Sequence, residues 1–227
     1  MLLVSMASVW SPAKAYAVDY SSDHSGFKCH QNPPAAAIKI EAPDLPVQVI
    51  TSLNADEIGA IAKGAVGLTV ENGKIVDGLT LLPDIKFDPA LEVSGIKEPG
   101  HICLWPSLMV LKLSFRQPIF VYINRDHPAK TCRYNVIRAH EFEHAQFDLD
   151  GYKHLIGYVT AALKEHALDI AVSGKGESQR DVEKAIGTEI TRSVQAAIDR
   201  AYAEMRAINA SIDTDANYTR MDGLCRK

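Results

Sequence analysis

The sequence lacks any strong excess of charge. Its 24 Lys and Arg residues stand against 28 Asp and Glu residues, which gives a formal net charge of -4 over 227 residues. The basic residues are dispersed, and the aromatic residues, 7% of the chain, do not alternate with them. A nucleic-acid-binding surface needs clustered basic side chains, often with aromatic rings for stacking. We therefore expect no nucleic acid among the partners.

Long apolar runs are also absent, so we expect no membrane span in the mature chain. Met1 to Trp10 is apolar but too short to cross a bilayer. Two small-x-small sites follow, Ala13-Lys-Ala15 and Ala15-Tyr-Ala17, which together are typical of a secretory signal peptide. No basic residue precedes the apolar run, so an ordinary buried N-terminal segment is the alternative. The sequence predicts a signal peptide over residues 1–17 and a bacterial protein that is periplasmic or secreted.

The rest of the chain predicts an α+β fold in a single domain over residues 36–227. Residues 18–35 are polar and rich in turn-forming residues, and we expect an N-terminal arm there. Residues 36–125 carry short runs of β-branched or alternating apolar residues, which favour a mostly antiparallel β region with one short helix at Ala55–Lys63. Asn72-Gly73 favours a hairpin turn, and Arg116-Gln117 is the expected turn of a second hairpin over residues 108–125.

Residues 133–212 predict two long antiparallel helices. From Asn135 to Val172 the apolar residues recur at steps of three and four, which is the helical period. A turn follows, and Ser178 is the expected cap of a second helix. The second helix carries one apolar stripe, formed by Val182, Ile186, Ile190, Val194, Ile198, Ala201, Met205 and Ile208.

The four cysteines, Cys29, Cys103, Cys132 and Cys225, have no close Cys or His partner at the spacing of a zinc knuckle. An even number of cysteines in an exported protein suggests two disulfides, for which three pairings exist. The hairpin expected over residues 108–125 would bring Cys103 close to Cys132. We therefore predict the pairs Cys103–Cys132 and Cys29–Cys225.

A metal-binding motif lies near the start of the first long helix. Residues 140–144 have the pattern His-Glu-x-x-His. His140 and His144 are four residues apart and so share one helix face, where their imidazoles can converge on one zinc ion. Glu141 is then placed to act as the general base that takes a proton from a zinc-activated water.

The third zinc ligand is ambiguous in the sequence. Asp150 has the spacing of a metzincin-like ligand, but Phe147 stands where those enzymes need a glycine. Glu165 has a thermolysin-like spacing, yet on a continuous helix it lies about 30 Å from His144.

A turn centred near residue 175 would instead place His144 level with residue 206 of the second helix. On that register Glu204 is the nearest acidic residue, and we predict it as the third ligand. Asp213, just past the helix, is the next candidate, and it could also orient a histidine. We expect Tyr134 and Tyr218 to have packing roles rather than to stabilise an oxyanion.

Several segments resemble those of a group of uncharacterised exported bacterial proteins that are predicted to be secreted zinc-dependent proteases. The resembling segments are Cys103, Phe120-Val-Tyr-Ile123, Cys132-Arg-Tyr-Asn135, residues 140–144, Ile212-Asp-Thr214, Tyr218, Arg220 and Cys225. They cover roughly the C-terminal half of the chain. The resemblance implies a compact zincin-like domain and assigns no substrate.

We therefore expect an exported zinc-dependent metallopeptidase that hydrolyses peptide or amide bonds of a peptide or protein substrate. The alternative is an exported binding module that does not catalyse a reaction and retains a metal site or a relic of one. A third hypothesis is a structural two-helix protein whose histidines bind nothing.

Overall fold

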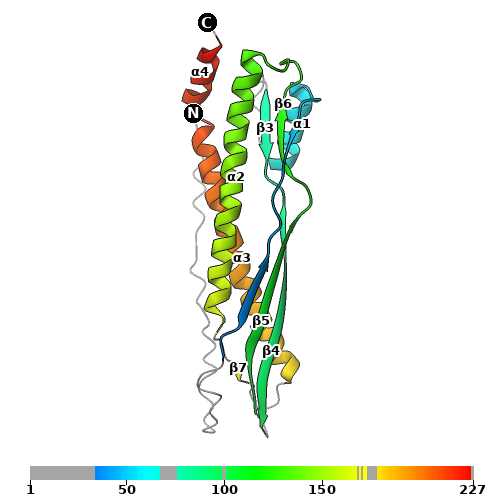
Figure 1. The fold of residues 1–227 in the computed structure, drawn as a ribbon, viewed down its shortest axis with the longest axis vertical. Coiled ribbons are helices and arrows are strands. Elements are labelled where there is room, and N and C mark those ends of the chain that lie inside the picture. Colours follow the sequence, from blue (N-terminus) through cyan, green and yellow to red (C-terminus); the bar gives the residue numbers. More distant parts are fainter. Residues whose placement is uncertain are drawn as a thin grey trace.

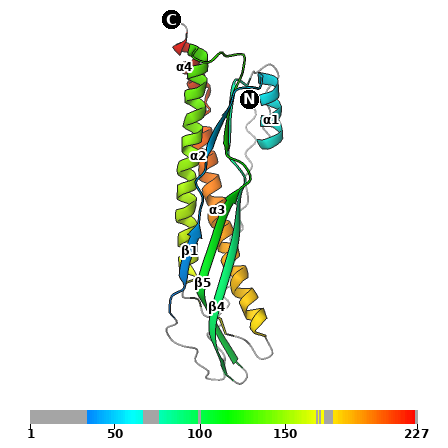
Figure 2. The ribbon, with the colours of Figure 1, turned by 45° about the vertical axis from the view of Figure 1, so that its right-hand side comes forward.

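The computed structural model describes residues 34–66, 76–98, 101–167, 169, 171–172 and 178–225. The predicted signal peptide, most of the predicted arm and the Asn72-Gly73 turn lie outside these residues. The α+β fold class is confirmed, because a region of two small sheets is followed by two long antiparallel helices (Figure 1). The molecule is elongated rather than compact, with the strands lying along one side of the helix pair in both views (Figures 1 and 2).

Three stretches of the chain each contribute one strand to both sheets. The first sheet has the strand order β1 (Ala37–Glu41), β5 (His101–Phe115), β4 (Ile85–Glu98), with the short β7 (Ala171–Val172) also paired to β5. The second has the order β2 (Val47–Ile50), β6 (Ile119–Ile123), β3 (Gly78–Leu81). β1 leads into β2, β3 into β4 and β5 into β6, so the two sheets follow one another along the molecule (Figure 1).

The hairpin predicted over residues 108–125 is wrong. β5 and β6 belong to different sheets, and the chain continues in one direction through the bend at Arg116-Gln117 (Figure 1). β1 pairs with β5 in parallel and β2 pairs with β6 in parallel, which fixes both strands in the same direction. The antiparallel partner of β5 is β4, from the Ile85–Phe115 pair to the Glu98–His101 pair.

The second sheet is covered by a helix on each face. α1 (Ala55–Val66), which confirms the predicted short helix, packs through Ile58 on Leu81 and Tyr122. The other face meets the first part of α2 (Cys132–Glu165), whose N-cap is Thr131. β3 therefore lies between α1 and the start of α2, where the metal motif is.

Two long helices form as predicted, but the first ends at Glu165 and not at Val172, because Ala171 and Val172 form a strand that pairs with β5. α3 (Gln179–Ile212) begins with a capping box in which the Ser178 hydroxyl accepts from the Asp181 amide and the Asp181 carboxylate accepts from the Ser178 amide. The predicted stripe of α3 is buried from Val182 to Met205, whereas Ile208 is exposed. Gly151 of α2 allows close approach, since a β-carbon there would lie 2.1 Å from Cγ of Met205.

The predicted register between the helices is wrong. His166, at the C-cap of α2, is within 2.8 Å of the Ser193 hydroxyl, so α2 ends beside the middle of α3. The connection does not turn back tightly, because it contains β7, which pairs with β5. The first turns of α3 pack instead on the sheet, where Gly187 lies over Leu91.

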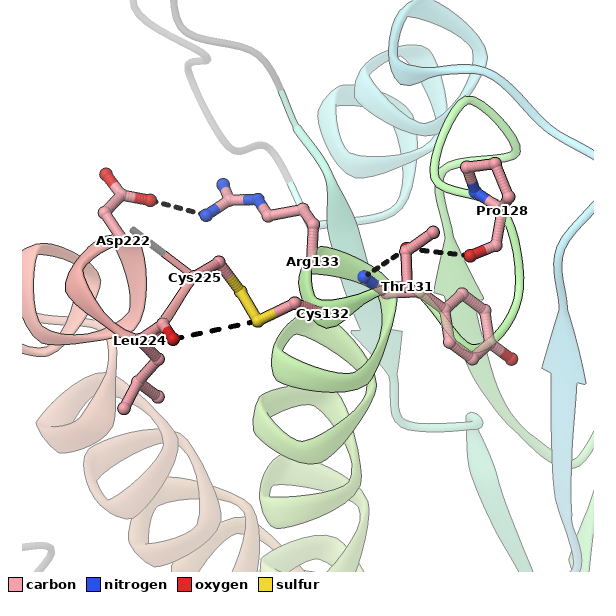
Figure 3. The surroundings of a disulfide bond; sticks show 8 residues. Pro128, Thr131, Cys132, Arg133, Asp222, Leu224 and Cys225 are labelled. Atoms are coloured by element: carbon pink, nitrogen blue, oxygen red, sulfur yellow. Dashed lines mark hydrogen bonds and ion pairs between the residues drawn. A yellow bond between two sulfur atoms is a disulfide. The ribbon is translucent and has the colours of Figure 1, made fainter. Parts of the chain in front are cut away.

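A disulfide joins Cys132, the first residue of α2, to Cys225, just after α4 (Asp215–Leu224) (Figure 3). Both predicted pairings are therefore wrong. Cys103 is also disulfide-bonded, and Cys29 lies outside the described residues. The physical reason is the missing hairpin: β5 and β6 run on in one direction, so Cys103 lies near the far end of α2 instead of beside Cys132.

Ion pairs also join the start of α2 to α4, and to the segment before β3. The guanidinium of Arg133 contacts Asp222 of α4 and, at 2.9 Å, Asp77 just before β3 (Figure 3 shows the Asp222 contact). Among the described helices, none combines the length and apolar character that crossing a membrane requires.

Candidate metal centre

Three side chains converge where α2 meets the segment between α3 and α4. Oδ1 of Asp213 lies 3.2 Å from Nε2 of His140 and 3.1 Å from Nε2 of His144. The two Nε2 atoms are 3.3 Å apart. Both imidazoles are buried, whereas the carboxylate side chain of Asp213 is 44% exposed. The three donor atoms thus form a nearly equilateral triangle with one side open to solvent.

This triangle fits one face of a metal tetrahedron. A tetrahedron's edge is about 1.6 times the distance from centre to corner, so ligands at roughly 2.0–2.1 Å from zinc are about 3.3 Å apart. The observed separations match that edge. Two imidazoles and one carboxylate suit catalytic zinc, and they also suit other divalent metals such as iron. The residues therefore fit a metal ion, and the choice of zinc rests on the motif.

His144 is oriented by a buried chain of hydrogen bonds. Nδ1 of His144 lies 2.9 Å from Oδ1 of Asn209 on α3, an oxygen that can only accept. Nδ1 therefore carries a proton, and Nε2, which donates to Asp213 in the metal-free protein, is the nitrogen that a metal ion would take in place of that proton. The Asn209 amide in turn donates to Asp148 at 2.7 Å. Asp148 is only 2% exposed. Burying a carboxylate costs free energy unless the carboxylate is hydrogen-bonded.

The segment after α3 supplies both Asp213 and a tyrosine. The Tyr218 hydroxyl donates to Oδ1 of Asp213 at 2.7 Å, and its ring packs edge-on against His140. Burial raises the pKa of Tyr218 well above its usual range, and the nearby Asp213 carboxylate raises it further. Burial opposes ionisation of Asp213, but hydrogen bonds from His140, His144 and Tyr218 outweigh it and hold its pKa far below the ordinary value.

Glu141 lies on the side of α2 that faces β3, which we call the β3 flank. Its Oε2 accepts a hydrogen bond of 2.8 Å from the Thr80 hydroxyl, and the residue is 5% exposed. Burial raises the pKa of the Glu141 carboxyl, against the lowering effect of Thr80 and of both histidines. Gly78 is needed for this approach, because a β-carbon there would lie 2.5 Å from Oε1 of Glu141.

The opposite side of His140 faces α4, and we call it the α4 flank. A groove of about 600 Å³ runs there between α2 and α4, and His140 is one of its lining residues. An α-helix turns by about 100° per residue. Val136 and Glu143, which line the groove, therefore fall on one side of His140, and Glu141 falls on the other.

The structure brings together His140, His144 and one of the four candidate third ligands. Asp213 joins the pair, and Glu204, the predicted ligand, does not. Glu204 instead accepts from the Tyr158 hydroxyl at 2.7 Å and pairs with Arg200. The cause is the longer connection between the helices, which sets Asn209 rather than residue 206 beside His144.

The two remaining candidates lie away from the triangle. Asp150 is bonded to Gln146 and Lys153 on the surface of α2. Glu165 is the last residue of α2, and the helix runs without a break from the motif to that point.

Sequence reasoning missed Asn209, Asp148, Thr80 and Gly78. Asp148 offered a weak signal, because it lies four residues after His144 and so shares its helix face. The other three come from distant parts of the chain, and nothing local marks them. Of the two tyrosines, Tyr134 packs against the core as expected, whereas Tyr218 contacts Asp213.

In comparisons with known proteins, neither a family model nor a curated protein nor a solved structure matches this chain. The resemblance to predicted secreted proteases therefore stays a prediction.

Proposed function

We propose that this protein is an exported zinc-dependent metallopeptidase with His140, His144 and Asp213 as its metal ligands. The observation that carries the proposal is the triangle of donor atoms, with sides of 3.1–3.3 Å, at the end of a His-Glu-x-x-His motif. The open fourth corner is where a substrate carbonyl and a water molecule would enter.

Three residues of the chain, His144, Asp213 and Glu141, support hydrolysis by their positions. His144 is held with its Nε2 toward the triangle by Asn209, and Asp213 is held by the Tyr218 hydroxyl. A zinc ion bound there would lower the pKa of a water molecule and polarise a scissile carbonyl. Glu141 is the acceptor for the proton, and its raised pKa makes it a stronger base than an exposed glutamate.

Export is part of the proposal. The disulfide between Cys132 and Cys225 supports it, since disulfides persist mainly in the periplasm and outside the cell.

A second candidate is an exported binding module that holds zinc and does not catalyse a reaction. One observation favours it: the carboxylate of Glu141 is tied to Thr80 on the β3 flank, while the groove reaches His140 from the α4 flank. In that case the metal would fasten the segment after α3 to α2, and the groove would bind a partner.

One experiment separates the two candidates. The purified chain and its Glu141→Gln variant are analysed for metal content, then tested with unfolded casein and peptidoglycan peptides. We expect one zinc per chain in both proteins and a loss of hydrolysis in the variant of about 10²–10⁴-fold. Full zinc occupancy without hydrolysis in the native chain would favour the binding module. A chain that stays free of zinc, grown with metal present, would defeat both.

A further inference from the structure

Asp213 is the one proposed metal ligand that does not lie on α2. His140 and His144 are held by a long helix that has buried residues on both sides of the motif, Ile137 and Ala145 among them. Asp213 instead lies between the end of α3 and the start of α4, and its side chain is 44% exposed. The metal centre is therefore complete only when residues 213–225, which we call the α4 segment, lie against the first part of α2.

Few buried side chains hold the α4 segment in that position. The last buried residue of α3 is Met205, and none of residues 206–212 is buried. In α4, Met221 is the one buried side chain, and Tyr218 is 45% exposed. α4 has ten residues, and an isolated helix of fewer than about 12–15 residues is marginal in water. The order of α4 therefore depends on its attachment to the rest of the fold.

The polar contacts of the α4 segment anchor it to α2 only weakly. Asn217 donates to the Ile212 carbonyl, and Arg220 donates to Asn217, so these side chains bond beside or within the segment. The ion pair between Arg133 and Asp222 does reach α2, but the two side chains are 36% and 49% exposed. Ion pairs as exposed as this one contribute little to stability.

The disulfide is the strong link between the α4 segment and α2. It joins Cys225, at the end of the segment, to Cys132, at the start of α2 (Figure 3). Asp213 lies at the other end of the segment, against His140 and His144. α4 thus lies between two attachments to the same part of α2, one covalent and one through the metal ligands. The two attachments reinforce each other, because the first to form already orders the residues that the second one needs.

We propose that this disulfide is a redox switch for metal binding: only the oxidised chain holds Asp213 in place tightly enough to complete the metal centre. Cys132 is exposed, so a dithiol reductant can reach the bond. Reduction transfers two electrons and two protons from the dithiol, which leaves thiols on Cys132 and Cys225 and a disulfide in the reductant. The chain then binds its metal weakly until it is oxidised again. The inference rests on the proposed function for the metal ligands and is independent of hydrolysis.

The zinc affinity of the variant Cys132→Ser/Cys225→Ser tests the switch. Serines are used because the thiolates that reduction leaves would themselves bind zinc. We expect the affinity to fall by about tenfold, which lies within the range usual for coupling between two sites, and competition with a chelator measures it. The matched control is Ile186→Ala, which removes buried apolar contacts from the first part of α3 and leaves the α4 segment untouched. The control should keep the native affinity although it lowers stability.

A double-mutant cycle shows whether the effect passes through Asp213. In the Asp213→Ala background the two serine substitutions should leave the remaining zinc affinity unchanged, because the ligand that the disulfide holds is already missing. An equal loss in both backgrounds would mean that the disulfide acts on the whole fold, and the inference would be overturned. If the serine variant does not fold, Met221→Ala takes its place, since it loosens α4 and keeps the disulfide. It should lower zinc affinity only when Asp213 is present.

Hydrogen exchange of the α4 amides gives a second readout. In the native chain α4 should be protected with and without zinc, whereas in the serine variant it should be protected only when zinc is bound, because coupling between two attachments is reciprocal. Equal protection of α4 in the two metal-free proteins would overturn the inference.

The outcomes also separate this inference from the proposed function. If the native chain hydrolyses no peptide but its zinc affinity depends on the disulfide, the switch stands and the peptidase assignment falls. If the chain hydrolyses peptides and the serine variant binds zinc as tightly as the native chain, the switch is overturned and the peptidase assignment stands.

Discussion

The two flanks of α2 at the metal motif differ in almost every physical respect. On the β3 flank, Glu141 is buried, bonded to Thr80 and covered by a glycine that leaves no room for a methyl group. On the α4 flank, Asp213 and Tyr218 are about half exposed, and an open groove reaches His140. Binding a metal and a ligand needs only the α4 flank, whereas hydrolysis needs Glu141 to act on the same atoms from the other side.

The largest expected effect concerns the third ligand. Replacing Asp213 by Ala should weaken zinc binding by more than about 100-fold, because losing a ligand costs more than the 10–100-fold that the loss of an outer hydrogen bond costs. Glu204→Ala should leave zinc affinity unchanged, since Glu204 contacts Tyr158 and Arg200 instead. Competition with a chromophoric chelator measures both. Equal affinities in the two variants would contradict the assignment.

Next in size is the effect of removing the amide that orients His144. Asn209→Ala should lower zinc affinity by about 10–100-fold, because Nδ1 of His144 loses its acceptor and Asp148 loses its donor. Gln195→Ala, which removes an exposed amide from the same helix, is the matched control. The same chelator titration applies, and an affinity within twofold of the native value would show that Asn209 has only a packing role.

A pair of glycine substitutions tests the closed flank. Gly78→Ala should destabilise the fold by about 1–3 kcal/mol, because its methyl group would overlap Glu141 and Ile137. It should also reduce hydrolysis while zinc stays bound, since the displaced group is Glu141. Gly157→Ala, in open space on α2, should raise stability by about 0.5–1 kcal/mol. Denaturant unfolding provides the comparison, and a Gly78→Ala protein as stable and active as the native chain would mean that the β3 flank is not tightly closed.

The smallest expected effect is on how the stability of the fold depends on pH through the ion pair between Asp77, just before β3, and Arg133 of α2. Burial alone would raise the pKa of Asp77, but hydrogen bonds from Arg133, His127 and Asn124 outweigh it and hold the pKa below its ordinary value. A carboxyl with a lowered pKa stabilises the fold above its unfolded pKa of about 3.9, and that contribution is lost as the pH falls through the folded value.

Asp77→Asn lacks this contribution, so its melting temperature should fall less steeply between about pH 5 and pH 3 than that of the native chain. Both proteins are compared without metal, so that release of a metal ion at low pH does not contribute, and titration of the ligand residues is common to both. Parallel curves would show that Asp77 does not titrate as a partner of Arg133.

The spacing of residues along the sequence predicted the features that depend only on nearby residues. The helical period placed both long helices and the buried stripe of α3, and the four-residue spacing placed His140 and His144 on one face. The third ligand could not be found this way, because it depends on where α3 lies along α2. That position is set by β7, a two-residue strand whose partner is about seventy residues earlier in the sequence.

The false hairpin has a similar cause. Two apolar runs around Arg116-Gln117 are compatible either with reversal or with continuation of the chain. Only the parallel pairing of β1 with β5 and of β2 with β6 decides between them. The error then carried over to the cysteines, since a reversed chain would have brought Cys103 to Cys132. The sequence holds no local sign that Cys132 meets Cys225.

The bond between Cys132 and Cys225 closes a covalent ring of about 94 residues that contains both long helices and all three proposed ligands. A protease that cuts the connection between α2 and α3 would leave two pieces that cannot diffuse apart. The metal ligands on both pieces would stay at a high effective concentration. Damage at the end of the molecule farthest from the motif would therefore spare the metal centre for as long as the ring stays oxidised.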